Sequence, residues 1–196
     1  MELYGGSDPS RQRHGPVRTI LAVDDSRTAL EAIGRRLAGL GYLTALSDNG
    51  AEALDLIAAR GFDLVLLDMV MPGLSGINVL REIRGCRDTV DLPVIMLTGR
   101  SDPAAAVEAL AAGADDHVAK PFAFEVLTAR IDRVLARAKR MTDLKRSNAT
   151  LDARIAARAM ELGEAKAELA ATRADRQRLI ASIQSLNDAV ERLGAG

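Results

Sequence analysis

The chain has 196 residues, with 26 basic and 27 acidic side chains and a formal net charge of −1. That length suffices for one well-packed domain of about 120 residues with roughly sixty left over, and the balanced charge argues against a general electrostatic footprint for nucleic acid. The single cysteine, Cys86, excludes an intrachain disulfide and a cysteine-based zinc cluster. Because no apolar run is long enough for a signal peptide core or a membrane span, we expect a cytoplasmic protein without membrane insertion.

The chain divides by pattern into three segments. Residues 1–16 are polar and rich in Gly, Pro, Ser and Arg, which is typical of a flexible tail. Residues 17–138 alternate short apolar runs with helical periodicity, and this alternation predicts an α/β domain with a parallel sheet. The expected strands are Thr19–Val23, Leu43–Ser47, Asp63–Leu67, Pro93–Leu97 and His117–Ala119. The expected helices are Thr28–Leu40, Gly50–Arg60, Gly76–Arg84, Asp102–Ala112 and Ala123–Ala138.

Residues suited to helix ends support this division. Glycines that tolerate a positive φ follow four of the helical segments, and small polar residues suited to amino-terminal caps precede three of them. The glycines are Gly41, Gly61, Gly85 and Gly113, and the expected caps are Ser26, Asp48 and Ser101.

Carboxylates follow two of the expected strands. Asp24 and Asp25 come directly after Thr19–Val23, and Asp68 comes directly after Asp63–Leu67. The carboxyl ends of parallel strands open on one edge of a sheet, so the three carboxylates are expected to converge. Clustered carboxylates repel and are costly to desolvate, and a site with few protein ligands and retained waters favours Mg²⁺.

Two further strand ends carry a hydroxyl and an ammonium group. Thr98 follows Pro93–Leu97, and Lys120 follows His117–Ala119. Each of these side chains alone would be read as a capping, turn or solvated residue. Together with a metal and carboxylates they suit a phosphoryl group, and Asp68 is then a candidate nucleophile.

These strand ends carry a family resemblance. The segments Val23–Ser26, Leu67–Gly76, Leu97–Gly99 and Lys120–Phe122 resemble, in order and position, the receiver domain of two-component response regulators, the CheY-like family. The resemblance covers about residues 17–138. It implies a flavodoxin-like (βα)5 doubly wound parallel sheet, and it implies that a histidine kinase or phosphotransfer protein donates a phosphoryl group to Asp68.

The resemblance also implies ligand roles. Asp25, Asp68 and the backbone carbonyl of Val70 would ligate Mg²⁺ directly, and Asp24 would act through a metal-bound water. Thr98 and Lys120 would bind the phosphoryl oxygens. The Lys120–Pro121 bond would be cis, an isomer that costs little free energy only when proline follows the bond.

His117 departs from the family pattern, in which Tyr or Phe commonly stands three residues before the lysine and takes part in the switch with Thr98. One interpretation is that His117 substitutes as a half-buried ring. The other is a modified, pH-sensitive switch, because histidine titrates near neutral pH.

Residues 139–193 contain no proline and repeat apolar residues in heptads. Twelve of sixteen a and d positions are apolar when Ala counts, which favours a coiled coil. The a positions are Met141, Asn148, Ile155, Leu162, Leu169, Arg176, Ile183 and Val190, and the d positions are Leu144, Leu151, Arg158, Ala165, Thr172, Leu179, Leu186 and Leu193.

The polar residues of this helix favour a parallel homodimer. Asn148 at an a position can fix register, and Glu161 (g) can meet Lys166 (e) of a second copy, as Glu168 can meet Arg173. An antiparallel hairpin or a partly disordered tail is the alternative.

The resulting interpretation is a regulatory phosphoacceptor, not an enzyme, that signals through a dimeric helical tail to a protein partner without binding nucleic acid directly. The alternative is the regulatory amino-terminal part of a multidomain enzyme, such as a cyclic-dinucleotide cyclase or kinase. A haloacid-dehalogenase-like phosphatase is disfavoured, because it would want an Asp where Val70 stands.

Overall fold

The computed structural model describes residues 17–99 and 103–194. Five strands form one parallel sheet in the order β2-β1-β3-β4-β5, and helices alternate with them along the chain. This is the flavodoxin-like doubly wound order, so the predicted fold class is confirmed. In chain order the elements are β1 (Thr19–Val23), α1 (Arg27–Gly39), β2 (Leu43–Ser47), α2 (Gly50–Ala59), β3 (Leu64–Asp68), α3 (Gly76–Gly85), β4 (Val94–Thr98), α4 (Pro103–Ala111), β5 (Asp116–Ala119) and α5 (Phe124–Gly194).

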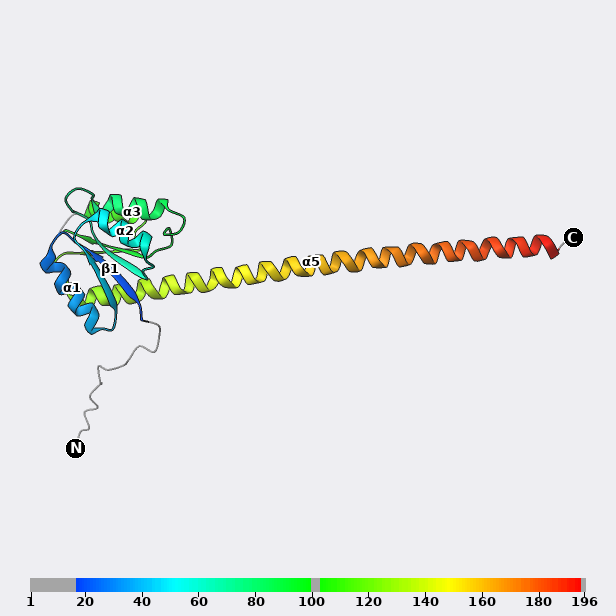
Figure 1. The fold of residues 1–196 in the computed structure, drawn as a ribbon, viewed down its shortest axis with the longest axis horizontal. Coiled ribbons are helices and arrows are strands. Elements are labelled where there is room, and N and C mark those ends of the chain that lie inside the picture. Colours follow the sequence, from blue (N-terminus) through cyan, green and yellow to red (C-terminus); the bar gives the residue numbers. More distant parts are fainter. Residues whose placement is uncertain (1–16, 100–102, 195–196) are drawn as a thin grey trace, which may run out of the picture. The chain divides into compact units, whose positions relative to one another are not determined.

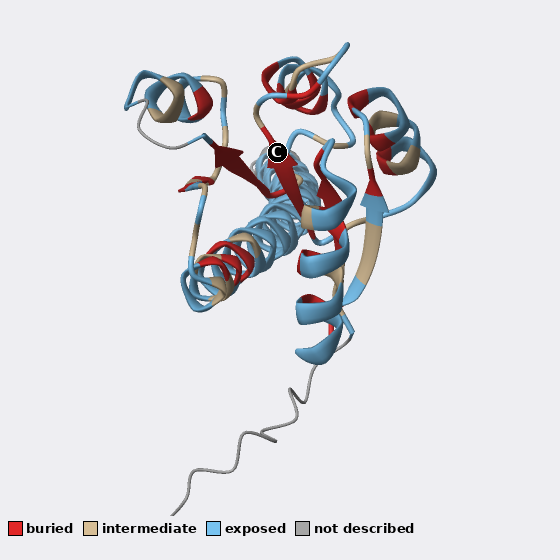
Figure 2. Ribbon diagram, turned by 90° about the vertical axis from the view of Figure 1, so that its left-hand side faces the viewer, coloured by how far each residue is buried: buried red, intermediate tan, exposed pale blue. Residues whose placement is uncertain are grey.

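Two apolar layers cover the sheet, one on each face. Figure 1 shows α1 on one side of the strands and α2 with α3 on the other. Side chains of α1 and the first turns of α5 pack on one face, and those of α2, α3 and α4 pack on the other. Because both faces are covered, every residue of β3 and β4 is buried, and these strands appear red in Figure 2. A parallel sheet buried on both faces explains their unbroken apolar sequence.

The ends of the strands place the polar residues. β1 and β2 have the expected bounds, whereas β3 and β4 each begin and end one residue later than expected. The ladder extends because the Met69 amide donates to the Leu97 carbonyl (2.9 Å) and the Lys120 amide donates to the Thr98 carbonyl (2.7 Å). Asp68 and Thr98 are therefore the last residues of their strands, which fixes their backbone more firmly than a loop would.

The helix ends follow the expectation only in part. Gly41 (φ +83°) and Gly113 (φ +99°) adopt the left-handed conformation that favours glycine. The same expectation for Gly61 and Gly85 is wrong. Gly85 is the last residue of α3, and α2 ends through an extended Arg60 just before Gly61, so neither position needs a positive φ.

The caps differ in a similar way. Ser26 caps α1 by accepting a hydrogen bond from the Ala29 amide (3.4 Å), as predicted. The cap of α2 is Asn49 rather than Asp48, because the Asn49 side chain accepts from the Glu52 amide (2.9 Å) while Asp48 pairs with Arg27 (3.1 Å). Ser101 lies outside the described residues, as do residues 1–16.

The helix α5 continues well past residue 138, where the last receiver helix was expected to end. The chain divides into two compact units, of which the first ends at Arg140 and the second begins at Met141. The assignment of residues 1–16, 17–138 and 139–193 to a tail, a receiver and a dimerising helix stays a prediction. Among the described residues, no helix has an apolar stretch long enough to cross a membrane.

Candidate functional site

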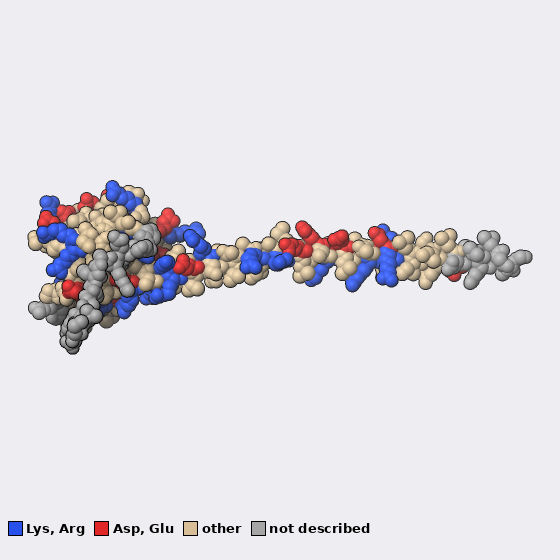
Figure 3. Space-filling model, turned by 90° about the horizontal axis from the view of Figure 1, so that it is seen from below, with Lys and Arg blue, Asp and Glu red and all other residues tan. Residues whose placement is uncertain are grey.

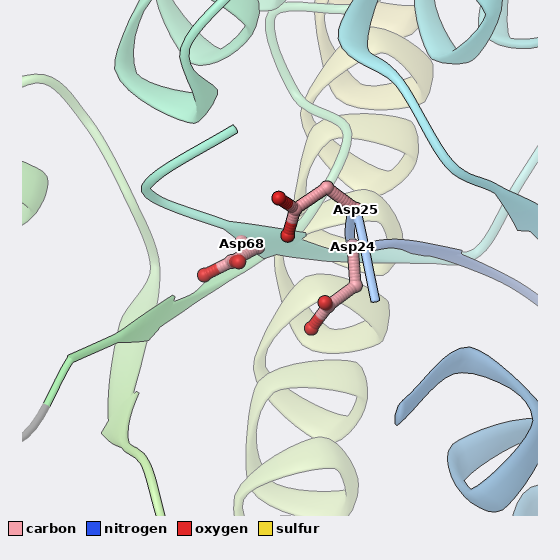
Figure 4. Close-up of side chains that lie close together, drawn as sticks. All are labelled: Asp24, Asp25 and Asp68. Atoms are coloured by element: carbon pink, nitrogen blue, oxygen red, sulfur yellow. The ribbon is translucent and has the colours of Figure 1, made fainter. Parts of the chain in front are cut away.

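Three carboxylates converge at the carboxyl edge of the sheet. Asp24 and Asp25 follow β1, and Asp68 ends β3, so their side chains gather around one point in Figure 4. One carboxylate oxygen from each lies within 4.8 Å of those of the other two. Sequence reasoning expected this convergence, and the structure brings the three residues together.

The surrounding backbone fixes Asp24. Its side chain accepts a hydrogen bond from the Ser26 amide (2.9 Å), and its own amide donates to the Ser47 carbonyl at the end of β2 (3.2 Å). Asp24 is only 1% exposed and Asp68 is 7% exposed, whereas Asp25 is open to solvent. Two buried carboxylates and one accessible carboxylate therefore form the cluster.

Lys120 lies between the two buried carboxylates. Its ammonium Nζ donates to Asp24 Oδ2 at 2.5 Å and lies 3.0 Å from Asp68 Oδ2. The lysine follows β5 directly, and the Lys120–Pro121 peptide bond is cis, as the resemblance implied. The Lys120 ammonium thus connects the ends of β1, β3 and β5, and its partner Asp24 is 96 positions away in the sequence.

Burial and charge change the acidity of two groups in the cluster. Burial raises the pKa of Asp68 above its ordinary value, and the neighbouring charges of Asp24 and Asp25 act in the same direction, while Lys120 opposes them. Burial alone would lower the pKa of Lys120, but its hydrogen bonds to Asp24 and Asp68 outweigh that effect and raise it. Lys120 is therefore cationic at neutral pH and partly balances the carboxylates.

The donor set fits a small hard cation. The three carboxylates carry more negative charge than one ammonium balances, and a divalent cation would relieve their repulsion. Few protein oxygens with one side open to water match Mg²⁺, which keeps several of its waters. Val70 lies in the loop after β3 and is 74% exposed, so the loop that carries its carbonyl lies at the surface. Its role as a ligand stays a prediction.

Thr98 is the other expected phosphoryl contact. It ends β4, is buried, and pairs in register with Ala119 of β5, the residue before Lys120. Gly99 follows it, and a Cβ built at Gly99 meets no atom of the described residues within 4 Å. The hydroxyl and the ammonium therefore come from adjacent strands at the same edge of the sheet.

Gly76 is a residue whose importance sequence reasoning missed. A Cβ at Gly76 would lie 1.9 Å from the Asp68 carbonyl oxygen and 2.9 Å from the Asp68 carbonyl carbon. The Gly76 amide donates to the Met69 carbonyl (3.0 Å), and Ser75 caps α3 by accepting from the Asn78 amide (3.4 Å). Only a residue without a side chain allows α3 to approach the backbone of Asp68 this closely. A polar residue with a glycine at the start of a helix was the available signal.

His117 lies on β5 and is not part of the cluster. It is half-buried and pairs in register with Met96 of β4. Its Nδ1 atom is buried and has no hydrogen-bond partner among the described residues. The ring is half-buried, as expected. Whether His117 simply replaces the family's aromatic ring or forms a pH-sensitive switch stays a prediction.

Asp116, at the start of β5, was not singled out from the sequence. Its buried carboxylate accepts from Arg130 Nη1 and from Arg133 Nη2 of α5, both at 2.7 Å. Burial would raise the pKa of Asp116, but hydrogen bonds from Arg130 and the His117 amide, together with the charges of Arg130 and Arg133, lower it overall. The contact connects β5 to α5. Arg130 and Arg133 are 14 and 17 positions from Asp116 and lie on a different element, so no local sequence pattern indicates the contact.

Comparisons with known proteins agree with this geometry. Response regulator MprA of Mycobacterium tuberculosis is 46% identical over 120 residues, which are 61% of this chain and 51% of that protein. The signal receiver domain of a signal transduction histidine kinase from Syntrophus aciditrophicus is 37% identical with a TM-score of 0.60, covering 63% of this chain and 94% of that one. The chemotaxis protein CheY4 of Vibrio cholerae is 30% identical with a TM-score of 0.58, covering 60% and 98%.

The chain spans about half the length of the curated relatives it matches. Within it, residues 20–132 match the family model of the response regulator receiver domain, and these residues include the whole carboxylate cluster and Lys120. The match covers more than half of the chain, and the strand order, the acidic cluster and the lysine agree with it. The chain therefore belongs to the response regulator receiver family.

Proposed function

We propose that the protein is a response regulator whose Asp68 accepts a phosphoryl group from a histidine kinase or a phosphotransfer protein. The observation that carries this proposal is the buried pair Asp24 and Asp68 held by the Lys120 ammonium beside Asp25. Such a pair is costly to bury and adds little as a structural feature. It is suited to receiving a group whose own charge needs cations around it.

The transfer is a displacement at phosphorus. A carboxylate oxygen of Asp68 attacks the phosphorus of a phosphohistidine, the phosphorus–nitrogen bond breaks, and the electron pair remains on the imidazole nitrogen. Asp25, Asp68 and the Val70 carbonyl would hold Mg²⁺ directly, with Asp24 acting through a metal-bound water, and the ion would neutralise charge on the phosphoryl oxygens. Lys120 donates to one of these oxygens in place of its contact with Asp68, and the Thr98 hydroxyl donates to another.

The chain acts as a phosphoacceptor and not as an enzyme that turns over a separate substrate. Among the described residues, the single cluster of potential metal ligands is the one that contains the acceptor itself. The product is thus a covalent change of state of this protein, which suits a regulatory role.

The second unit supplies the output in this proposal. Between Met141 and Leu186 α5 carries a stripe of apolar residues, and every residue of this stripe that the structure describes is exposed. Helices with such a stripe are stable when another helix covers it, and we take that helix to come from a second copy of the chain. Phosphorylation of Asp68 then changes the geometry or affinity of the dimer.

The test is phosphoryl uptake from acetyl phosphate in the presence of Mg²⁺. Intact-mass measurement should show one added phosphoryl group on the wild type and none on Asp68→Asn. Asp55→Asn, which removes an exposed carboxylate of α2, is the matched control and should be modified like the wild type. An unmodified wild type, or equal modification of Asp68→Asn, contradicts the proposal.

A second measurement addresses the output. Light scattering and crosslinking, with and without beryllofluoride and Mg²⁺, should differ between the two states. Identical mass and crosslinking patterns would remove the tail from the proposed mechanism but would leave phosphoryl acceptance intact.

A further inference from the structure

The second unit has an apolar stripe, and from Met141 to Leu186 the structure describes no buried residue in it. Between Met141 and Leu186, the large apolar side chains at a and d positions are 48% to 67% exposed, the extremes being Leu151 and Ile155. The stripe consists of Met141, Leu144, Leu151, Ile155, Leu162, Leu169, Leu179, Ile183 and Leu186. A spacing of three and four residues along this length requires another helix with the same period to cover it.

The charges beside the stripe identify the covering helix. Glu161, Glu168 and Asp175 occupy three successive g positions, one heptad apart. Lys166 and Arg173 occupy the e positions that follow the first two. Figure 3 shows acidic and basic side chains interspersed along this part of the tail. The acidic g positions and the basic e positions lie on opposite sides of the stripe. The acidic side of one helix is therefore complementary in charge to the basic side of an identical helix.

Three basic groups beside or within the stripe lack a partner among the described residues. Arg158 pairs with Glu161 (2.8 Å) and Arg178 approaches Asp175 (3.6 Å), and in each pair the exposed side chains stand three positions apart on the helix. Within the part of the chain that the structure describes, the side chains of Lys166, Arg173 and Arg176 make neither an ion pair nor a hydrogen bond. That last guanidinium occupies an a position, in the seam itself, where a charge needs a partner.

The orientation of the covering helix follows from which positions meet. In a parallel coil a g residue faces the e residue five positions later on the other helix, and an a residue lies beside the preceding g residue of that helix. Glu161 then meets Lys166, Glu168 meets Arg173, and Arg176 lies beside Asp175, each time on the second copy.

An antiparallel pairing of the same region gives the opposite result. There g residues face g residues and e residues face e residues, so the three acids would face one another, as would Lys166 and Arg173. Like charges placed opposite each other select against that arrangement.

We propose that the tail pairs with a second copy of this chain, parallel and in register, and that the charge block Glu161–Arg176 sets that orientation. The inference rests on the proposed self-association of the tail and specifies its geometry. The apolar stripe drives association, because exposed ion pairs contribute little each. Asn148, at an a position near the start of the stripe, reinforces the register by hydrogen bonding to Asn148 of the second copy.

Charge reversal tests the pairing in the full-length chain. Glu161→Lys with Glu168→Lys gives an acid-reversed variant, and Lys166→Glu with Arg173→Glu gives a base-reversed variant. Each alone places like charges opposite each other, so sedimentation at low salt should show homodimers weakened roughly tenfold to a hundredfold. An equimolar mixture should form heterodimers, and the chain that carries all four changes should dimerise like the wild type.

The control changes the same charges away from the seam. Asp143→Lys with Glu164→Lys alters two c positions, which face solvent in any coil, and should leave the dimer unchanged. A base-reversed or acid-reversed homodimer as stable as this control would overturn the charge assignment.

Crosslinking reports orientation directly. In a Cys86→Ser background, Thr172→Cys places a thiol at a d position, and a parallel in-register pair brings the two thiols together into a disulfide. A dimer without this disulfide under oxidation overturns the parallel geometry while self-association stands, and a monomeric wild type overturns both. Phosphoryl uptake at Asp68, measured on the same preparations, is independent of either result.

Discussion

The contact between Gly76 and the Asp68 backbone makes the site sensitive to one methyl group. In Gly76→Ala the new Cβ would lie 1.9 Å from the Asp68 carbonyl oxygen and 3.0 Å from the Met69 Cα. An ordinary contact between carbon and oxygen is about 3.3 Å, so α3 or the end of β3 must move by roughly 1.4 Å. Both colliding groups are backbone, and neither is the flexible end of a side chain.

This overlap should cost about 3 kcal/mol of unfolding free energy, the upper part of the range for overpacking a closed core. It should also slow phosphoryl uptake, because the carbonyl that moves belongs to Asp68, the proposed acceptor. Urea titration followed by tyrosine fluorescence measures the first effect, since the chain has no Trp and Tyr42 is buried. Timed uptake from acetyl phosphate measures the second.

Gly85→Ala is the matched control at the other end of α3. Its Cβ would meet nothing within 4 Å and its φ is not positive, so alanine's higher helix propensity should stabilise the protein by up to about 1 kcal/mol. The two substitutions in one helix thus have opposite predicted signs. A Gly76→Ala midpoint equal to that of the wild type would refute the reasoning from close approach.

Three more predictions concern the cluster and its neighbour on β5. The pKa of Asp68 is raised in the folded state, so the free energy of unfolding that this carboxyl contributes is fully present below about pH 3.8 and is lost as pH rises through the folded value. Asp68→Asn should therefore be more stable than the wild type at pH 7 and equal to it at pH 3. Urea titrations that gave the same difference in stability at both pH values would contradict this. Lys120→Met leaves two buried carboxylates without their ammonium and should cost about 3–5 kcal/mol without Mg²⁺. Part of that loss should return in thermal melts as Mg²⁺ is added, and melts insensitive to Mg²⁺ would count against a metal site. His117→Phe removes a buried Nδ1 that has no partner among the described residues and should raise stability by about 1 kcal/mol. If its phosphorylation-induced NMR shifts match those of the wild type from pH 6 to 8, a pH-sensitive switch is excluded.

Residues at strand ends were predictable because a parallel sheet leaves few places for them. An apolar run flanked by carboxylates or a lysine determines both a strand and the edge to which its polar end points, so Asp24, Asp68 and Lys120 could be brought together from sequence. The one-residue shift of β3 arose because the pairing of Met69 with Leu97 depends on the neighbouring strand. Periodicity along one segment contains no information about that neighbour.

The errors and omissions have the same origin. Asp48 and Asn49 are adjacent and both suit a cap, and the choice between them depended on Arg27, which is 21 positions from Asp48 and takes that carboxylate. The Asp116 contacts with α5 likewise join separate elements. Local sequence identifies residues able to cap or pair, whereas tertiary packing decides which of them do so.

The residues at the two ends of β5 form ion pairs with different parts of the molecule, so the strand is a short rigid connection between them. Just after one end Lys120 contacts Asp68, the proposed acceptor, and at the other end Asp116 forms ion pairs with Arg130 and Arg133 of α5. β5 itself has four residues, which span about 13 Å at 3.3 Å per residue. In the proposed transfer Lys120 exchanges Asp68 for a phosphoryl oxygen, and a displacement of the Lys120 backbone would then be transmitted along β5 to Asp116 and its two arginine partners on α5.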